Sequence, residues 1–171
     1  NTGSVSGSSD YVGGVCGWNH NSTIKNSYNI GSVKGKYYVG GVCGYNYDCS
    51  TIKNSYNTGL VSGLSDRYSV GGVCGCNWDG TIENSYYLKN CNAEGTTFTN
   101  NNDGTEKTYD QFESGEVAYL LQGKQEAEIW GQEITKDKLP VLNSRNKVYK
   151  AIAYSSIENE IISEIYLNKS L

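Results

Sequence analysis

The sequence VGGVCGWNHNSTIKNSYN at residues 12–29 is written almost unchanged twice more. It returns as VGGVCGYNYDCSTIKNSYN at residues 39–57 and as VGGVCGCNWDGTIENSYY at residues 70–87. Self-similarity at a fixed period of 20 to 50 residues is the signature of a repeat protein, in which each unit stacks on the next. The fold question therefore becomes what one unit looks like.

Working outward from these copies divides the first half of the chain into three units of 28, 28 and 30 residues: 1–28, 29–56 and 57–86. Each unit holds three short β-like runs with glycine at the corners, and the extra residues fall in turns. We predict a mainly β fold, a right-handed parallel β-solenoid (β-helix) of three coils over residues 1–87. Neighbouring coils are expected about 4.8 Å apart, so that equivalent positions line up in columns along the axis.

Composition supports β structure and excludes several classes of protein. Of the 171 residues, 37% are apolar, Gly numbers 21 and Tyr numbers 15 against two Phe, which disfavours a helical bundle. The net charge is −4, with five acids and five bases in residues 1–86, so we expect no nucleic-acid partner. No apolar run is long enough for a membrane span, and no signal peptide is visible.

The chain starts at Asn1 and contains no Met. We therefore expect it to be a segment of a longer parent chain, whose other domains are its partners. We also expect the first coil, which has no coil before it, to fray or to self-associate.

Three cysteines, Cys16, Cys43 and Cys74, share one position of the repeat. A catalytic nucleophile is needed once, whereas a buried free cysteine acts as a small apolar packing residue, so we predict a stacked interior row. The single histidine, His20, shares its column with Tyr47 and Trp78, and a Cys–His catalytic pair is therefore disfavoured. Cys49, Cys76 and Cys91 do not repeat; a disulfide among them stays open, and their spacing does not match a zinc site.

Three further columns of polar or aromatic residues are candidate sites. We predict an amide ladder at a solenoid corner for Asn19, Asn46 and Asn77. We predict turn residues for Asn21, Asp48 and Asp79, with a calcium site or an acid/base pair as the alternative. We predict a stacked ladder for Tyr28, Tyr56 and Tyr86, with a sugar-stacking surface strip as the alternative.

After the repeats the pattern changes. Residues 88–107 are polar and predict a loop, and residues 108–151 predict a helix plus strands that cap the solenoid, with a Thr108–Gln111 capping box and a helix end near Gly123. Residues 152–171 predict an amphipathic helix or a linker to a following domain, from the spacing of Ile157, Ile161 and Ile165 behind a Ser155–Glu158 capping box.

The repeated residues resemble the GLUG motif, which occurs in tandem in large secreted and cell-surface proteins of anaerobic bacteria, adhesin-like proteins among them. The resemblance rests on the Gly-Gly, Gly-x-Asn, Thr-Ile and Ser-Tyr-x-x-Gly elements in order, with Cys where such repeats more often carry Val. The segment FESGEVAYLLQGKQEAEIWGQEITKDKLPVL resembles the stretch that commonly follows such repeats. The resemblance implies a secreted or cell-surface location and no catalytic residues.

Two functions from different classes follow. The first is a non-catalytic structural stalk, adhesion or ligand-presenting solenoid, whose ligand is a host or cell-surface glycan or protein. The second is a fragment of a polysaccharide-processing β-helix enzyme or a carbohydrate-binding region. The enzyme needs two or three acidic or basic groups converging on one face, and only Asp48 and Asp79 are in register. We therefore favour the first, with no catalytic residue, cofactor or metal site assigned.

Overall fold

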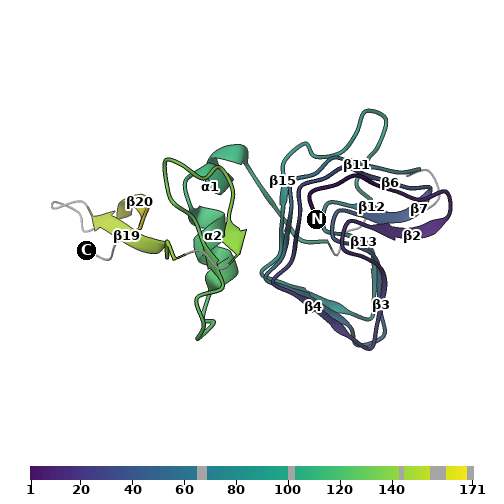
Figure 1. Ribbon diagram of the computed structural model, residues 1–171, viewed down its shortest axis with the longest axis horizontal. Helices are drawn as coiled ribbons and strands as arrows, with labels where there is room; N and C mark the ends of the chain where they lie inside the picture. Colours follow the sequence, from purple (N-terminus) through teal and green to yellow (C-terminus); the bar gives the residue numbers. More distant parts are fainter. Residues whose placement is uncertain (65–68, 100–102, 143–144, 155–160, 169–171) are drawn as a thin grey trace. The chain divides into compact units, whose positions relative to one another are not determined.

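The computed structural model describes residues 1–64, 69–99, 103–142, 145–154 and 161–168. The chain forms two compact units, Asn1–Lys107 and Thr108–Leu171 (Figure 1). Within the described residues, no helix combines the length and the apolar character needed to cross a membrane.

The first unit is built from coils of five short strands. The first coil contains β1 (Val5–Ser6), β2 (Asp10–Gly13), β3 (Cys16–His20), β4 (Thr23–Lys25) and β5 (Tyr28–Asn29). The second contains β6 (Val33–Lys34), β7 (Tyr37–Gly40), β8 (Cys43–Tyr47), β9 (Thr51–Lys53) and β10 (Tyr56–Asn57). The third contains β11 (Val61–Ser62), β12 (Val70–Gly71), β13 (Cys74–Trp78), β14 (Thr81–Glu83) and β15 (Tyr86–Leu88).

Every strand of a coil pairs in parallel with the same strand of the next coil. The register follows the repeat, as in Cys16 with Cys43 and Cys43 with Cys74. The coils therefore overlie one another in Figure 1. The prediction of a mainly β, parallel solenoid is confirmed, because repeat length and strand register agree at each of the five positions.

The core runs through the coils as two clusters of apolar side chains, each made of several columns. One contains Val12, Val33, Val39, Val61 and Val70. The other contains Val42, Cys43, Ile52, Val73 and Cys74. Side chains of β-branched residues suit such a column because they pack against the identical residue one strand away.

Two ladders of asparagines hold the corners. Asn19 Nδ2 donates to Asn46 Oδ1, and Asn46 Nδ2 donates to Asn77 Oδ1, each at 2.7 Å. Each of these amides also donates to a backbone carbonyl of its own turn, at 3.1 to 3.2 Å. The predicted amide ladder is confirmed. The second ladder, Asn1 to Asn29 to Asn57 at 2.8 Å per step, was not predicted.

Most described residues of 88–107 form a loop as predicted, but the segment is not separate from the repeats. Strand β16 (Thr105–Lys107) pairs in parallel with β15, and Asn92 forms a parallel bridge with Val61. Thr99 N donates to Val70 O at 2.8 Å. This segment is a shortened fourth coil, which its polar composition concealed because its pairing uses backbone groups.

In this fourth coil the side chain of Asp103 accepts the hydrogen bonds that a strand carbonyl accepts in the other coils. In the second coil, the N–H groups of Val42 and Cys43 donate to Val73 O of the third coil, at 2.8 and 3.0 Å. In the third coil, the equivalent N–H groups of Val73 and Cys74 donate to Asp103 Oδ1, at 2.9 and 2.7 Å. The carboxylate thus takes the place of a backbone carbonyl and ends this part of the solenoid.

The second unit contains two short helices and two antiparallel strand pairs. Helices α1 (Tyr109–Glu113) and α2 (Glu116–Gln122) meet at Gly115, whose φ of +91° favours glycine. The capping box formed by Thr108 and Gln111 is present as predicted. Strand β17 (Trp130–Gly131) pairs with β18 (Val141–Leu142), in agreement with the strands predicted within residues 108–151.

Two buried glutamines hold this unit together. Gln132 Nε2 donates to the carbonyls of Phe112, Glu113 and Asp137 at 2.9 to 3.1 Å. Gln122 Oε1 accepts from the N–H groups of Ile129 and Trp130. These contacts explain the Trp-Gly-Gln sequence, because the glutamine serves carbonyls that the short helices leave unpaired.

The amphipathic helix expected in residues 152–171 is wrong for the described part. Strand β20 (Ile161–Leu167) pairs antiparallel with β19 (Tyr149–Tyr154). Ile161 and Ile165 lie on this strand, while Ser155, Ile157 and Glu158 lie outside the described residues. Isoleucine spacing of four fits a strand period of two as well as a helix turn, and the β-branched side chains favour the strand.

Candidate functional site: an exposed aromatic face

Strands β3, β8 and β13 have two different sides. The first residue of each strand is a cysteine and the fourth is an asparagine, and both point into the coil. The side chains of Cys43 and Asn46 are fully buried there. The residues on either side of the asparagine point outward, because successive side chains of a strand lie on opposite faces. The outward residues are Trp18 and His20 in β3, Tyr45 and Tyr47 in β8, and Cys76 and Trp78 in β13.

The outward rings touch one another in a continuous series. Tyr11 lies beside Trp18, Tyr38 and Tyr45, with ring centroids 5.2 to 5.9 Å apart. His20 lies between Trp18 at 5.6 Å and Tyr47 at 5.5 Å. Trp78 is in register with Tyr47. We call this set the aromatic face: Tyr11, Trp18, His20, Tyr38, Tyr45, Tyr47 and Trp78.

The face is open to solvent. Trp78 is 64% exposed, Trp18 55% and Tyr11 40%. Soluble proteins rarely leave a contiguous apolar patch uncovered, and such a patch marks an interaction surface. The aromatic face is therefore the candidate functional site.

The backbone is specially shaped to place Tyr11 and Tyr38 on this face. Both have left-handed φ values, 59° and 49°, which are uncommon for a bulky residue. The backbone at Tyr11 also passes close to two glycines: a Cβ at Gly17 would lie 2.6 Å from Tyr11 O, and one at Gly44 would lie 2.6 Å from Tyr11 C. Strained residues of this kind persist where the surrounding structure fixes them, and they gather at functional sites.

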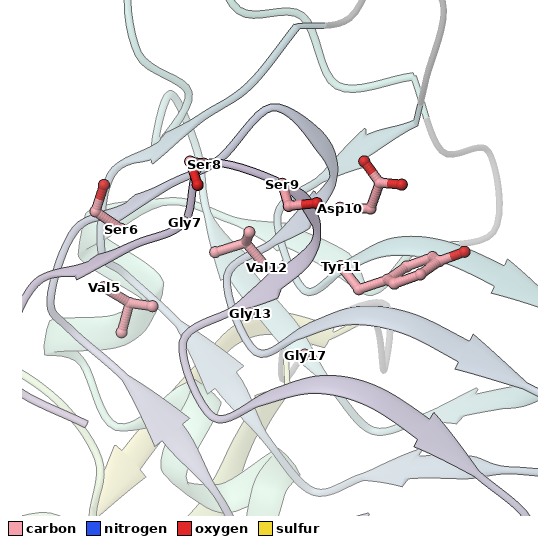
Figure 2. Close-up of a pocket in the computed structure, with 10 residues that line it drawn as sticks. All are labelled: Val5, Ser6, Gly7, Ser8, Ser9, Asp10, Tyr11, Val12, Gly13 and Gly17. Carbon is pink, nitrogen blue, oxygen red and sulfur yellow. The ribbon is translucent and has the colours of Figure 1, made fainter.

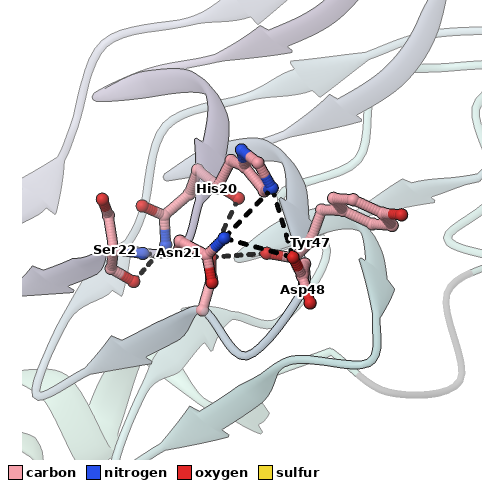
Figure 3. Close-up of polar contacts among 7 residues, drawn as sticks. His20, Asn21, Ser22, Tyr47 and Asp48 are labelled. Atoms are coloured by element: carbon pink, nitrogen blue, oxygen red, sulfur yellow. Dashed lines mark hydrogen bonds and ion pairs between the residues drawn. The ribbon is translucent and has the colours of Figure 1, made fainter.

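A polar cluster borders the rings. Asp48 Oδ2 lies 3.3 Å from His20 Nε2 and accepts a hydrogen bond from Asn21 Nδ2 at 3.1 Å (Figure 3). Asn21 Nδ2 also lies 3.3 Å from the same histidine nitrogen. The three side chains meet at the turn that follows β3 and β8, and they offer carboxylate, amide and imidazole groups beside the aromatic surface.

The cysteine row is structural, as predicted. Cys16, Cys43 and Cys74 are in register, and the last two are fully buried. Contact with the Cys43 thiol, together with burial, raises the pKa of Cys16 far above its ordinary value. Because the thiolate is the reactive form, the raised pKa disfavours Cys16 as a nucleophile at neutral pH.

The remaining cysteines form no disulfide with one another. Cys49, Cys76 and Cys91 are all described residues, and all are free thiols. Burial raises the pKa of Cys91 to about 12, and Asn57 Nδ2 donates to its sulfur at 3.7 Å.

The remaining two candidate columns, those of Asn21 and Tyr28, have the structural roles that were predicted. Asn21, Asp48 and Asp79 have φ values of 47°, 52° and 59°, which are turn conformations that Asn and Asp tolerate. The described residues contain no group of three potential metal ligands. Tyr28 and Tyr56 stack at 5.4 Å, and Tyr56 is 1% exposed, so this column is an interior ladder and no surface strip.

A hollow of about 350 Å³ lies at the first coil and is lined by residues 5–13 with Gly17 (Figure 2). Tyr11 points away from Val12 there. In the second coil the equivalent Val33 and Val39 are almost fully buried, because a coil stacks on each side. The hollow is thus the place that a neighbouring coil occupies elsewhere in the repeat.

Sequence reasoning missed the aromatic face. The available signal was the strand alternation: with Asn19 assigned to the interior, its neighbours Trp18 and His20 had to point outward, next to tyrosines in the following coil. Tyr11 and Tyr38 gave no such signal, because their placement depends on a left-handed backbone that tyrosine seldom adopts.

Comparison with known proteins identifies the repeat. The family model "The GLUG motif" matches residues 8–34, 35–62 and 66–86. Neither the curated proteins nor the solved structures give a match to this chain. The matches lie within the first three coils and end before the fourth coil and the second unit.

Proposed function

Because this chain carries three GLUG motifs stacked in register, we propose that it is a non-catalytic module of a longer secreted or cell-surface protein, adhesive in function. In this proposal the solenoid is a rigid support and the aromatic face is the surface that it presents to a ligand.

One observation carries the proposal: identical interior columns support an outward surface of seven aromatic residues that the fold does not bury. The interior ladders of valine, cysteine and asparagine account for stability. The exposed rings contribute little to it, since Trp18 and Trp78 keep more than half of their surface in water. A surface retained without a folding role is what a binding module requires.

A non-catalytic role is favoured by the use that the structure makes of its reactive groups. The thiols of the cysteine row are packed inside, and Asp48 and Asp79 occupy tight turns. The polysaccharide-processing alternative requires two carboxyl groups facing one sugar from opposite sides, whereas Asp48 is directed at His20 and Asn21.

The location is tested on cells of the organism that makes the protein. Antibodies raised against residues 1–171 are expected to label intact cells or the culture medium, and protease treatment of intact cells is expected to remove the label. An antibody to a cytoplasmic protein serves as the control for cell integrity. Labelling only after permeabilisation contradicts a surface role.

The absence of catalysis is tested with the purified chain and a panel of plant and bacterial polysaccharides. We expect no release of reducing ends or unsaturated sugars during prolonged incubation, with an active glycosidase as the positive control. Turnover that depends on Asp48 contradicts the proposal.

A further inference from the structure

We propose that the aromatic face binds an uncharged oligosaccharide, which lies along the solenoid axis across successive coils. The inference deepens the proposed function, because it names the ligand class of the surface that the module presents. It is independent of where the cell places the protein, so binding and surface labelling can fail separately.

The first argument is the combination of rings and polar groups. A sugar ring has faces of C–H groups and a rim of hydroxyls, so it needs an aromatic surface with hydrogen-bonding groups at the edge. Tyr11, Trp18 and Tyr45 provide adjoining ring surfaces, while Asp48 and Asn21 stand at the border of the face. Sites that combine apolar and aromatic walls with a few placed polar groups are typical of small-molecule binding.

The second argument is the spacing. Rings in equivalent positions repeat from the first coil to the second, with Tyr11 and Tyr38 at 5.3 Å and His20 and Tyr47 at 5.5 Å between centroids, and Trp78 continues the second of these columns in the third coil. This interval follows the strand spacing of about 4.8 Å. It is comparable to the length of one sugar unit in an extended chain, so successive units meet equivalent rings.

The third argument is charge. The charged side chain in the polar cluster is a carboxylate, Asp48, and the repeat region has five acids and five bases. Single-stranded nucleic acids also stack on aromatic side chains, but they require a positively charged groove along the backbone. Sulfated and sialylated glycans are disfavoured for the same reason.

The fourth argument is the preformed geometry. The left-handed backbones of Tyr11 and Tyr38 hold these rings on the face in the absence of a ligand, and glycines at 17 and 44 leave room for that backbone. A preordered surface avoids the entropic cost of ordering side chains on binding.

Tryptophan fluorescence of the whole chain, residues 1–171, tests the proposal directly. Two of the three tryptophans, Trp18 and Trp78, lie on the aromatic face, whereas Trp130 is 1% exposed in the other unit. The probes are cellohexaose, xylohexaose and mannohexaose, with a heparin hexasaccharide, a thymidine hexanucleotide and an aromatic peptide as competitors for the assignment. We expect at least one neutral hexasaccharide to shift the emission and to protect it from iodide quenching.

Matched variants locate the binding. Trp18→Ala and Tyr45→Ala are expected to weaken binding about tenfold or more, a typical cost of removing a central aromatic contact. Trp18→Phe keeps a ring and is expected to retain most of the affinity. Tyr109→Ala removes a ring of comparable exposure, 43%, in the second unit, and is expected to leave the affinity within about twofold. Circular dichroism of each variant confirms folding.

Three results overturn the proposal. The first is that no neutral hexasaccharide binds at millimolar concentration. The second is that Trp18→Ala and Tyr109→Ala bind equally well. The third is that the peptide, the nucleotide or the heparin fragment binds to the face while neutral sugars do not.

Discussion

Strands β3, β8 and β13 carry cysteine and asparagine at their inward positions in all three coils, whereas the outward positions change from coil to coil. The inward column reads Cys16, Cys43 and Cys74, and the outward columns read Trp18, Tyr45, Cys76 and His20, Tyr47, Trp78. An inward side chain must fit against its own copy above and below, which allows few residue types. An outward side chain faces water, so it is free to vary with a ligand.

We expect the largest loss of stability when an inward asparagine is replaced. Asn46 is fully buried, accepts from Asn19, and donates to Asn77 and to Ser50 O. Asn46→Ala removes three interior hydrogen bonds at once and interrupts the amide ladder, and we expect a loss of about 3 kcal/mol in the free energy of unfolding.

The outward control is Tyr47→Ala, on the same strand and one position away. We expect it to cost about 1 to 2 kcal/mol, less than Asn46→Ala, since the Tyr47 ring is only partly buried and leaves no interior ladder interrupted. Urea unfolding followed by circular dichroism compares the two. Equal losses would remove the distinction between the inward and outward sides.

Much of the solenoid was predictable because the repeat compares each residue with its own copies. Cys16, Asn19 and Tyr28 could be placed inside and in register from three nearly identical phrases. The fourth coil was not predictable, because Asn92 and Thr99 join it through backbone groups and Asp103 joins it by imitating a carbonyl. The aromatic face required a left-handed Tyr11, which no local pattern indicates.

A smaller loss of stability is expected when Asp103, whose side chain acts as a strand carbonyl, is replaced. Asp103 accepts from the N–H groups of Gly72, Val73, Cys74 and Gly104. Asp103→Ala leaves these groups without an acceptor, and we expect a loss of about 2 kcal/mol. Asp10→Ala, an exposed carboxyl in β2, is the matched control and should change stability by less than about 0.5 kcal/mol.

The same residue predicts a pH dependence. Burial raises the pKa of Asp103 from 3.8 to about 6, although the four backbone N–H groups lower it. The folded state therefore holds this proton more tightly than the unfolded chain. Its contribution to stability is complete below about pH 4 and is lost as the pH rises through 6. Unfolding curves between pH 4 and 7 should show this decline in the native chain and not in Asp103→Ala; identical slopes would contradict the assignment.

The smallest expected effect comes from changing an inward column while keeping its shape. The triple variant Cys16→Val, Cys43→Val and Cys74→Val replaces each thiol with a side chain of similar volume in a row already bordered by Val42 and Val73. Swaps that conserve volume cost little, and the weak thiol donors Cys43 and Cys74 give up only hydrogen bonds of 3.3 and 3.1 Å to carbonyls. We expect a loss below about 1.5 kcal/mol, with cooperative unfolding and any sugar binding unchanged.

Thiol labelling of the native chain separates this interpretation from a reactive row. Cys49 is exposed and should react at once, whereas Cys43 and Cys74 are buried and should react only as the coil opens. The triple variant should keep the fast phase of Cys49 and lose the part of the slow phase that comes from Cys43 and Cys74, while the buried Cys91 still reacts slowly. Rapid labelling of Cys43 or Cys74 in the folded protein, or loss of cooperative unfolding in the triple variant, would mean that the thiols themselves are required. The repeated cysteine would then need a chemical explanation in place of a packing one.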